Sequence, residues 1–483
     1  MNVKSKLDNP STKEENMPDL EYIFHPKSIA IAGASRTPQN PVNLFYLNGL
    51  TRFDYGGALY VIHPEASELS GLKAYPSIMD IPGSIDHVIC GIRASLTPQL
   101  MRECVAKGVK LVQIFTAGFS ETGEEEGIRL EKEIIEIARR GKIRVLGPNS
   151  MGIYCPESKV SYVSSFPKKS GNVGFLCQSG GNSYDLINIG SARGVRFSKV
   201  VSYGNAPDIN EAELLEYFTH DPQTKIIIGY IEGTRDGRRF AKALQKAAEA
   251  KPVILLKGGT TEAGTKAAAS HTGALAGSIV TWSSLFHQLG VMQVYDLQEM
   301  VDSILLFLHL KPLTGRKVGL IGIGGGCSVL ATDICTREGL TIVPFPLDLR
   351  KKLREIMPDE LDPGTSMRNP VDVSSLGWRP DIFLKALEAV ASYNGIDFVL
   401  TYVTTPFGKG ATRRLNGHID ALIETKKRMD KPIATVLQRN DAPEAANLAF
   451  DLQNRCAQAG IPVFPSFNRA ARALSRFVQY YER

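Results

Sequence analysis

The sequence predicts an α/β protein made of three consecutive doubly wound domains of the Rossmann or flavodoxin type. Short continuous apolar runs alternate with amphipathic stretches along the 483 residues, which is the pattern of buried parallel strands separated by helices. The run that opens each of the three series leads into a glycine-containing turn and a helix, at Gly33, Gly180 and Gly324. A chain of this length also favours two to four domains.

The first series lies within residues 20–150. Its strands are expected at Ser28–Ala32, Ala58–Ile62, His87–Ile92, Leu111–Phe115 and Arg144–Leu146. The stretches between them include helical patterns at residues 97–107 and 127–140. We assign residues 20–150 to a Rossmann-like domain and expect the polar residues 1–19 to form a disordered tail.

The second and third series both begin with a strand, a glycine turn and a helix. Strands of the second are expected at residues 172–177, 199–202, 225–230 and 252–257. Strands of the third are expected at residues 317–323, 340–343, 398–402, 432–437 and 463–464, before a terminal helix. Because Pro312 and Gly315 mark a boundary, we predict flavodoxin-like domains over residues 151–312 and 313–483.

The composition is that of a soluble globular protein, with 43% hydrophobic and 22% charged residues. The net charge of +6 suits an anionic ligand, but no basic run is interleaved with aromatic residues, so no nucleic-acid partner is expected. No apolar run reaches the roughly 20 residues that span a bilayer, and no targeting pattern precedes the first strand. The seven cysteines are scattered without a CxxC pair, which indicates reduced thiols and no metal site. We therefore expect a cytoplasmic protein without a membrane partner.

Two turns that follow strands are candidate ligand sites. Gly33-Ala34-Ser35-Arg36 follows the first strand, where a glycine lets the backbone approach an anion and the next helix points its N–H groups at it. An ordinary tight turn explains these residues about equally well. The three spaced glycines of a dinucleotide site are absent, so a nicotinamide cofactor is not supported. Asn149, in the Gly147–Gly152 turn, also lies where doubly wound sheets bind ligands, or in a simple interdomain turn.

The glycine turns of the second and third series are better candidates for binding an anion. Ser179, Gly180 and Gly181 open one helix, and Gly324, Gly325 and Gly326 open another. The two helix N-termini could aim at one phosphoryl group, each contributing roughly 0.3–2 kcal/mol of favourable dipole and hydrogen-bond energy. The alternative is that both are only strand–helix turns.

His271 is the most specific candidate for a catalytic residue. It stands in Ser270-His271-Thr272-Gly273, among small residues that leave its ring accessible, and a neutral imidazole is a nucleophile near neutral pH. Glu232 follows a predicted strand, where its carboxylate could bond an imidazole N–H and fix the tautomer. A structural histidine and a surface glutamate are the alternatives. Four other histidines are expected in loops or at the surface: His25, His63, His220 and His418.

Together these motifs resemble the α-subunits of ADP-forming acetate–CoA ligases, in the succinyl-CoA synthetase superfamily. The resemblance runs from about Phe24 to Ser475. It is carried by Gly33-Ala34-Ser35, Ala117-Gly118-Phe119, Gly147-Pro148-Asn149, Gln178-Ser179-Gly180, Tyr230-Ile231-Glu232-Gly233, Ser270-His271-Thr272-Gly273 and Asn369-Pro370-Val371-Asp372. The resemblance implies a CoA-binding domain followed by two succinyl-CoA-synthetase-like domains.

The resemblance also implies roles for single residues. His271 resembles the phosphorylated histidine and Glu232 its hydrogen-bonding partner. The remaining expected contacts are CoA at Gly33, Ala34, Ser35, Arg36 and Pro64, and phosphate or substrate at Asn149, Ser179, Gly180, Gly181, Gly324, Gly325 and Gly326. In such enzymes an acyl carboxylate takes the phosphoryl group from histidine, and CoA then displaces phosphate from the acyl phosphate.

The resemblance further implies a partner. The family's ATP-grasp domain, which handles ATP or ADP with Mg, has no counterpart in these residues, so a separate ATP-grasp β subunit and a hetero-oligomer are expected. Coenzyme A and a small carboxylic acid are the expected substrates, with no tightly bound cofactor. Glu65 and Asn40 stand where family members often carry lysine or glycine near CoA, and Ser150 replaces a common cysteine. These departures keep open a second hypothesis, a non-catalytic CoA-sensing or scaffold homologue; a nicotinamide dehydrogenase is a distant third.

Overall fold

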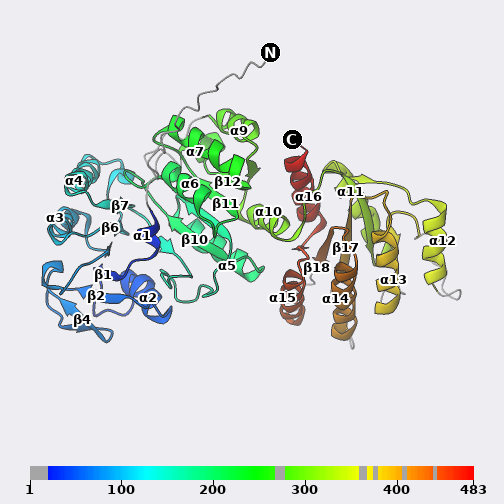
Figure 1. The fold of residues 1–483 in the computed structure, drawn as a ribbon, viewed down its shortest axis with the longest axis horizontal. Helices are drawn as coiled ribbons and strands as arrows, with labels where there is room; N and C mark the ends of the chain where they lie inside the picture. The colour runs from blue at the N-terminus through cyan, green and yellow to red at the C-terminus, as the bar shows by residue number, and fades with distance from the viewer. Residues whose placement is uncertain are drawn as a thin grey trace, which may run out of the picture.

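A computed structural model describes residues 20–266, 278–357, 367–373, 379–404, 411–438 and 443–482. Three mainly parallel sheets follow one another along the chain, each with helices packed on it, so the predicted fold class is confirmed (Figure 1). The tail expected at residues 1–19 lies outside the described residues. Within the described ranges, no helix is long and apolar enough to cross a membrane.

The first sheet has seven strands in the order β3-β4-β2-β1-β5-β6-β7. They are β1 Ser28–Ala32, β2 Ala58–Ile62, β3 Glu68–Leu69, β4 Leu72–Tyr75, β5 His87–Cys90, β6 Leu111–Ile114 and β7 Arg144–Leu146. All neighbours are parallel except β3 and β4. Every residue of β1, β5 and β6 is buried, which explains why their sequences are mainly apolar and do not alternate.

Helices cover both faces of this sheet. They are α1 Glu21–Phe24, a π-helix Asn43–Leu47, α2 Asn48–Arg52, α3 Thr97–Lys107 and α4 Glu125–Gly141. Helix α3 starts with a proline in its first turn and stops at Gly108, which has a φ of 74°, as helix signals require. Helices α3 and α4 pack on one face, whereas the apolar core on the other face continues into the second sheet.

The second sheet has the order β13-β12-β11-β9-β10-β8, in which β8 is antiparallel to β10. Its strands are β8 Gly152–Tyr154, β9 Val173–Cys177, β10 Phe197–Ser202, β11 Ile226–Ile231, β12 Val253–Lys257 and β13 Met292–Val294. Its helices are α5 Gly180–Ala192, α6 Glu211–His220, α7 Gly237–Ala250, α9 Ile279–Gln288 and α10 Leu297–His309.

The third sheet has the order β15-β14-β17-β18-β19, and β16 also pairs with β14. Its strands are β14 Lys317–Gly322, β15 Thr341–Ile342, β16 Val371–Asp372, β17 Phe398–Thr404, β18 Ile433–Gln438 and β19 Val463–Phe464. Its helices are α11 Gly325–Arg337, α12 Leu347–Ile356, α13 Pro380–Ala391, α14 Ala411–Arg428, α15 Pro443–Gln458 and α16 Phe467–Tyr481.

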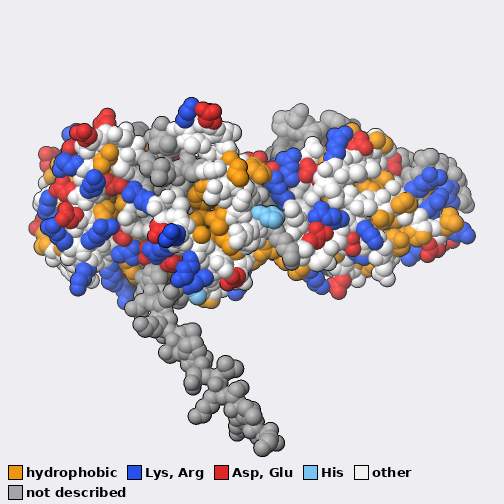
Figure 2. All heavy atoms as spheres, turned by 90° about the horizontal axis from the view of Figure 1, so that it is seen from above, with side chains coloured by type: hydrophobic (Ala, Val, Ile, Leu, Met, Phe, Trp, Pro, Cys, Tyr) orange, Lys and Arg blue, Asp and Glu red, His pale blue; other side chains and the backbone are white. Residues whose placement is uncertain are grey.

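Buried charges join the second sheet to the third, where α10 packs against α16 (Figure 1). Asp302 on α10 has a side chain only 2% exposed; it forms an ion pair with Arg193 Nη1 and accepts a hydrogen bond from Arg469 Nε, each at 2.6 Å. Arg193 also donates to the carbonyl oxygen of Val463 at 2.8 Å. Arg193, which directly follows α5, and Arg469 on α16 therefore meet at one carboxylate of α10, and Arg193 also ties this cluster to β19. Elsewhere, acidic and basic side chains are interspersed over the face seen in Figure 2.

The expectation that His418 lies in a loop or at the surface is wrong. His418 is fully buried on α14, and its ring centroid lies 4.8 Å from that of Phe383 on α13. Its neighbours at helical spacing, Leu415 and Leu422, are buried as well. The histidine therefore shares the apolar face of an amphipathic helix.

Candidate functional site

The first parallel strand of each sheet has neighbours on both sides, so the strand order reverses there, which is where doubly wound sheets form a crevice at the carboxyl ends of the strands. Strand β1 lies between β2 and β5, β9 between β10 and β11, and β14 between β15 and β17. Ligands of doubly wound sheets bind at such reversals of strand order. Each of these three strands leads into one of the glycine turns that the sequence singled out, so the site residues are described crevice by crevice.

In the first crevice, Gly33 occupies a position that only glycine fits. Its φ is +104°, and a Cβ there would lie 2.4 Å from the carbonyl oxygen of Gly91, which follows β5. The next residues are held by Asn43, whose Nδ2 donates to Ser35 O at 2.7 Å and whose Oδ1 accepts from Ser35 N at 3.1 Å. Ala34 is buried and Arg36 is exposed. Asn43 escaped the sequence analysis because it stands inside an apolar stretch.

Pro64 and Glu65 follow β2 and are exposed beside the same crevice. The backbone N–H of Glu65 donates to His63 Nδ1 at 3.1 Å, which ties this turn to the end of the strand. Asn40 Oδ1 accepts from the N–H groups of Val42 and Asn43 at 2.9 and 3.3 Å. Asn40 thus satisfies backbone donors at the start of the following helical segment.

The turn that contains Asn149 joins the first crevice to the second. Asn149 has a φ of 56°, and its N–H donates to Thr116 O at 3.0 Å. Two residues later, the side chain of Met151 lies against Gly180, because a Cβ on Gly180 would come within 2.7 Å of Met151 Cγ. Ser150 is buried, with its Oγ bonded to Ile114 O at 3.3 Å. The Asn149 turn is therefore packed against the start of α5.

The second crevice contains the N-terminus of α5. Ser179 caps the helix, with its Oγ accepting from Asn182 N at 3.2 Å. Gly180 and Gly181 form the first turn, and a Cβ on Gly181 would meet nothing within 4 Å. The first N–H groups of a helix lack partners within the helix and carry its positive dipole end. This open glycine turn is therefore suited to an anion.

Glu232 lies in the same crevice, directly after β11, and is only 7% exposed. Its backbone N–H and that of Gly233 donate to Gln178 Oε1 at 2.8 and 3.2 Å. Its carboxylate oxygen Oε1 accepts from the Tyr230 hydroxyl at 3.0 Å. The structure thus brings Glu232 together with the Gln178-Ser179-Gly180 turn, and the alternative of a surface glutamate is wrong.

Lys257 at the end of β12 completes the floor of this crevice and was not selected from the sequence. Its buried ammonium donates to Glu232 O at 2.7 Å and to Gly258 O, and it lies 5.3 Å from the ring centroid of Trp282. Burial lowers its pKa and the Glu232 charge raises it, with a net shift downward. The chain runs on from β12 toward His271, which lies outside the described residues.

The third crevice holds the Gly324–Gly326 turn at the start of α11. Gly324 has a φ of +110°, and its N–H donates to Asp372 Oδ1 at 2.8 Å. Gly325 and Gly326 are exposed. Helices α10 and α16 lie between α5 and α11, since α5 packs on α10, α10 on α16 and α16 on α11 (Figure 1). Within this chain the two glycine turns therefore belong to separate crevices.

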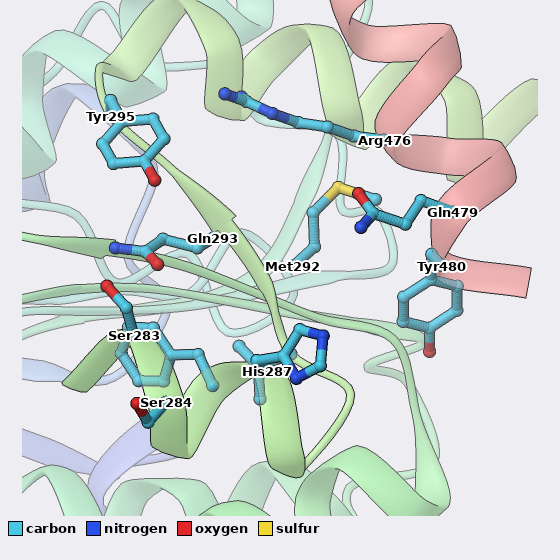
Figure 3. Close-up of a pocket in the computed structure, with 11 residues that line it drawn as sticks. Ser283, Ser284, His287, Met292, Gln293, Tyr295, Arg476, Gln479 and Tyr480 are labelled. Carbon is cyan, nitrogen blue, oxygen red and sulfur yellow. The ribbon is translucent and has the colours of Figure 1, made fainter. Parts of the chain in front are cut away.

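A further concavity lies away from the glycine turns. It has a volume of about 520 Å³ and is lined by residues of α9, β13 and α16, among them His287, Tyr295, Arg476 and Tyr480 (Figure 3). None of its lining residues was predicted for the site. Among the described residues, no group of three or more His, Cys, Asp or Glu side chains could hold a metal ion.

Comparisons with known proteins agree with this architecture. The family described as "CoA binding domain" matches residues 27–156, and the family described as "Succinyl-CoA ligase like flavodoxin domain" matches residues 170–307. The solved dinucleotide-forming acetyl-coenzyme A synthetase 1 of Candidatus Korarchaeum cryptofilum, in complex with phosphate and ADP, superposes with a TM-score of 0.81. It is 29% identical, with 96% of this chain and 97% of that chain covered.

Two curated relatives show how much of the length of related enzymes this chain covers. It is 40% identical to the ADP-forming acetate–CoA ligase of Methanocaldococcus jannaschii, covering 74% of this chain but only 49% of that protein. It is 33% identical to the alpha subunit of ADP-forming acetate–CoA ligase II of Pyrococcus furiosus, covering 95% of this chain and 97% of that subunit. Since the latter match extends over nearly all of both chains, this chain belongs to the family of ADP-forming acetate–CoA ligases.

Proposed function

We propose that this chain is the alpha subunit of a nucleoside-diphosphate-forming acyl-CoA synthetase and that His271 carries the phosphoryl group. The observation that supports this most is the buried Glu232 carboxylate beside the open N-terminus of α5. A carboxylate that orients an imidazole and a helix dipole that stabilises a phosphoryl dianion are the two groups that a phosphohistidine needs.

In the proposed reaction, a carboxylate oxygen of the acid attacks phosphorus on phospho-His271, and the neutral imidazole leaves. The CoA thiolate then attacks the acyl carbon, and inorganic phosphate leaves as acyl-CoA forms. Passing through a phosphoenzyme divides one difficult transfer into two easier ones. Glu232 fixes the tautomer of the imidazole throughout.

The proposed binding residues follow the crevices. CoA would lie along the first, at Gly33, Ala34, Ser35, Arg36 and Pro64. The phosphoryl group would face Asn149, Ser179, Gly180 and Gly181 when the histidine reacts with the acid. The turn Gly324, Gly325 and Gly326 is proposed as a second phosphate-facing helix start, in the crevice of the third sheet.

The nucleotide step is assigned to a partner. The chain covers 49% of one relative and nearly all of a relative named as an alpha subunit, which supports a separate subunit for the rest of the activity. We propose that this partner is an ATP-grasp β subunit that binds Mg with ATP or ADP, in a hetero-oligomer. All seven cysteines are free thiols, which fits the proposed cytoplasmic location.

The test is formation of phosphohistidine in the reverse direction. The protein is incubated with a panel of acyl-CoAs, beginning with acetyl-CoA, and radiolabelled inorganic phosphate, without nucleotide or partner. Acid-labile, base-stable label is expected on the native protein and on a His220→Ala control, which alters an exposed histidine of α6, but not on His271→Ala. Label on the His271→Ala variant would move the phosphorylated residue elsewhere. CoA binding without label from any acyl-CoA would favour the CoA-sensing alternative.

A further inference from the structure

Glu232 is held by side chains from three neighbouring strand ends. Gln178, after β9, accepts from the N–H groups of Glu232 and Gly233. Lys257, at the end of β12, donates to the carbonyl oxygen of Glu232 at 2.7 Å. These two contacts fix the backbone from which the glutamate projects. Tyr230, two residues earlier on β11, donates to the carboxylate itself, at Oε1.

The surroundings of the Tyr230 hydroxyl favour its hydrogen bond to the Glu232 carboxylate. A Cβ on Gly258 would lie 2.6 Å from the tyrosine oxygen, so the glycine provides the space that the hydroxyl occupies. Burial, and then the neighbouring Glu232 charge, raise the pKa of Tyr230. The hydroxyl therefore keeps its proton and remains a donor to the carboxylate at neutral pH.

We infer that Tyr230 is a positioning residue of the phosphohistidine step, which acts by fixing the rotation of the Glu232 carboxylate. The inference rests on the proposed function. A carboxylate can orient an imidazole only if it is itself oriented, and groups that bond such a carboxylate support the reaction without touching the reacting atoms. Without the Tyr230 hydroxyl, the Glu232 side chain would sample other rotations, and the histidine would less often have the geometry for phosphoryl transfer.

The test combines Tyr230→Phe with Glu232→Gln and measures the rate of phosphohistidine formation from acyl-CoA and labelled phosphate. Tyr230→Phe is expected to slow labelling about tenfold, which corresponds to about 1.4 kcal/mol, and to leave the Kd for CoA unchanged. In the Glu232→Gln background the same change is expected to have no further effect, because residues that act as a unit are not additive. Tyr217→Phe is the matched control, since the half-buried Tyr217 on α6 also donates to a glutamate, Glu21, in a hydrogen bond that is exposed.

A second variant guards against a folding defect. Gly258→Ala retains every hydrogen-bonding group but crowds the Tyr230 oxygen, and it is expected to slow labelling as Tyr230→Phe does. Native-rate labelling by Tyr230→Phe, or equal slowing in the presence and absence of Glu232→Gln, would overturn the inference while leaving the phosphoenzyme intact. Absence of label on the native protein would instead contradict the proposed function.

Discussion

Replacing Asp302 by asparagine is expected to weaken the junction between the second and third sheets. The substitution keeps the size of the side chain but removes the charge that two arginines share. Asp302 forms an ion pair with Arg193 Nη1 at 2.6 Å and accepts hydrogen bonds from Arg469 Nε and Nη2 at 2.6 and 2.8 Å. The side chain of Arg193 is 9% exposed, so water cannot replace its partner, whereas that of Arg469 is 26% exposed and can be partly rehydrated.

The magnitude follows from these contacts. A hydrogen bond to a charged group contributes about 1.5–3 kcal/mol, and removing one partner of a buried ion pair costs about 3–5 kcal/mol. If the ion pair with Arg193 is lost and water partly replaces the bonds of Arg469, we expect Asp302→Asn to reduce the free energy of unfolding by about 3–4 kcal/mol. For a domain of about 150–250 residues each kcal/mol lowers the Tm by about 2–4 °C, so the apparent Tm should fall by roughly 6–16 °C.

Scanning calorimetry measures this effect, and the chain offers a matched control. Asp430, which follows α14, pairs with Lys311 in the segment between α10 and β14 at 3.1 Å, but the two side chains are 97% and 73% exposed. Asp430→Asn should leave the Tm unchanged, because exposed ion pairs contribute little. Equal shifts in Tm for the two variants, or no shift for Asp302→Asn, would refute the reasoning that the buried Asp302 carboxylate stabilises the junction between the two sheets.

Two further predictions concern the first sheet. Gly33→Ala should abolish CoA binding in calorimetric titration, because its Cβ would clash with the backbone after β5. Gly108→Ala, also at positive φ but with nothing within 4 Å, should retain it; loss of binding in both would point to backbone strain alone. Burial lowers the pKa of His87 to about 4, from an ordinary value of 6.5. Its neutral form is therefore favoured in the folded state, so its contribution to stability is complete above pH 6.5 and is lost as the pH falls toward 4. Between pH 7 and pH 4, the native protein should lose about 3 kcal/mol more stability than His87→Leu in urea unfolding, and parallel pH curves would contradict this.

The central strands could be predicted from sequence because they are buried on both faces. β1, β9 and β14 are mainly apolar runs, and each has a glycine at its end or within the next three residues. Strands β3, β4, β8, β13 and β16 were missed. Four of them have only two or three residues, which is too few to show a periodicity. The π-helix at Asn43–Leu47 has no sequence signal of its own.

The candidate site was partly predictable for the same reason. Ser179 and Glu232 were found because each lies within two residues of the end of a strand, which is a local property. The contacts that hold Glu232 join residues far apart in sequence, such as Gln178 and Lys257, and depend on which strands become neighbours. The separation of Gly180 from Gly324 by two helices likewise depends on packing that no local pattern encodes.

The α10–α16 junction has a consequence for how such chains can be divided. Its contacts are a buried ion cluster and an aromatic group, in which the Phe307 ring lies 5.0 Å from that of Phe477, and neither needs the peptide link between α10 and β14. A gene cut between residues 310 and 316 should therefore yield two polypeptides that recognise one another and reassemble. If the two polypeptides reassemble, the α10–α16 contacts are sufficient to hold these two parts together, whether they belong to one chain or to two.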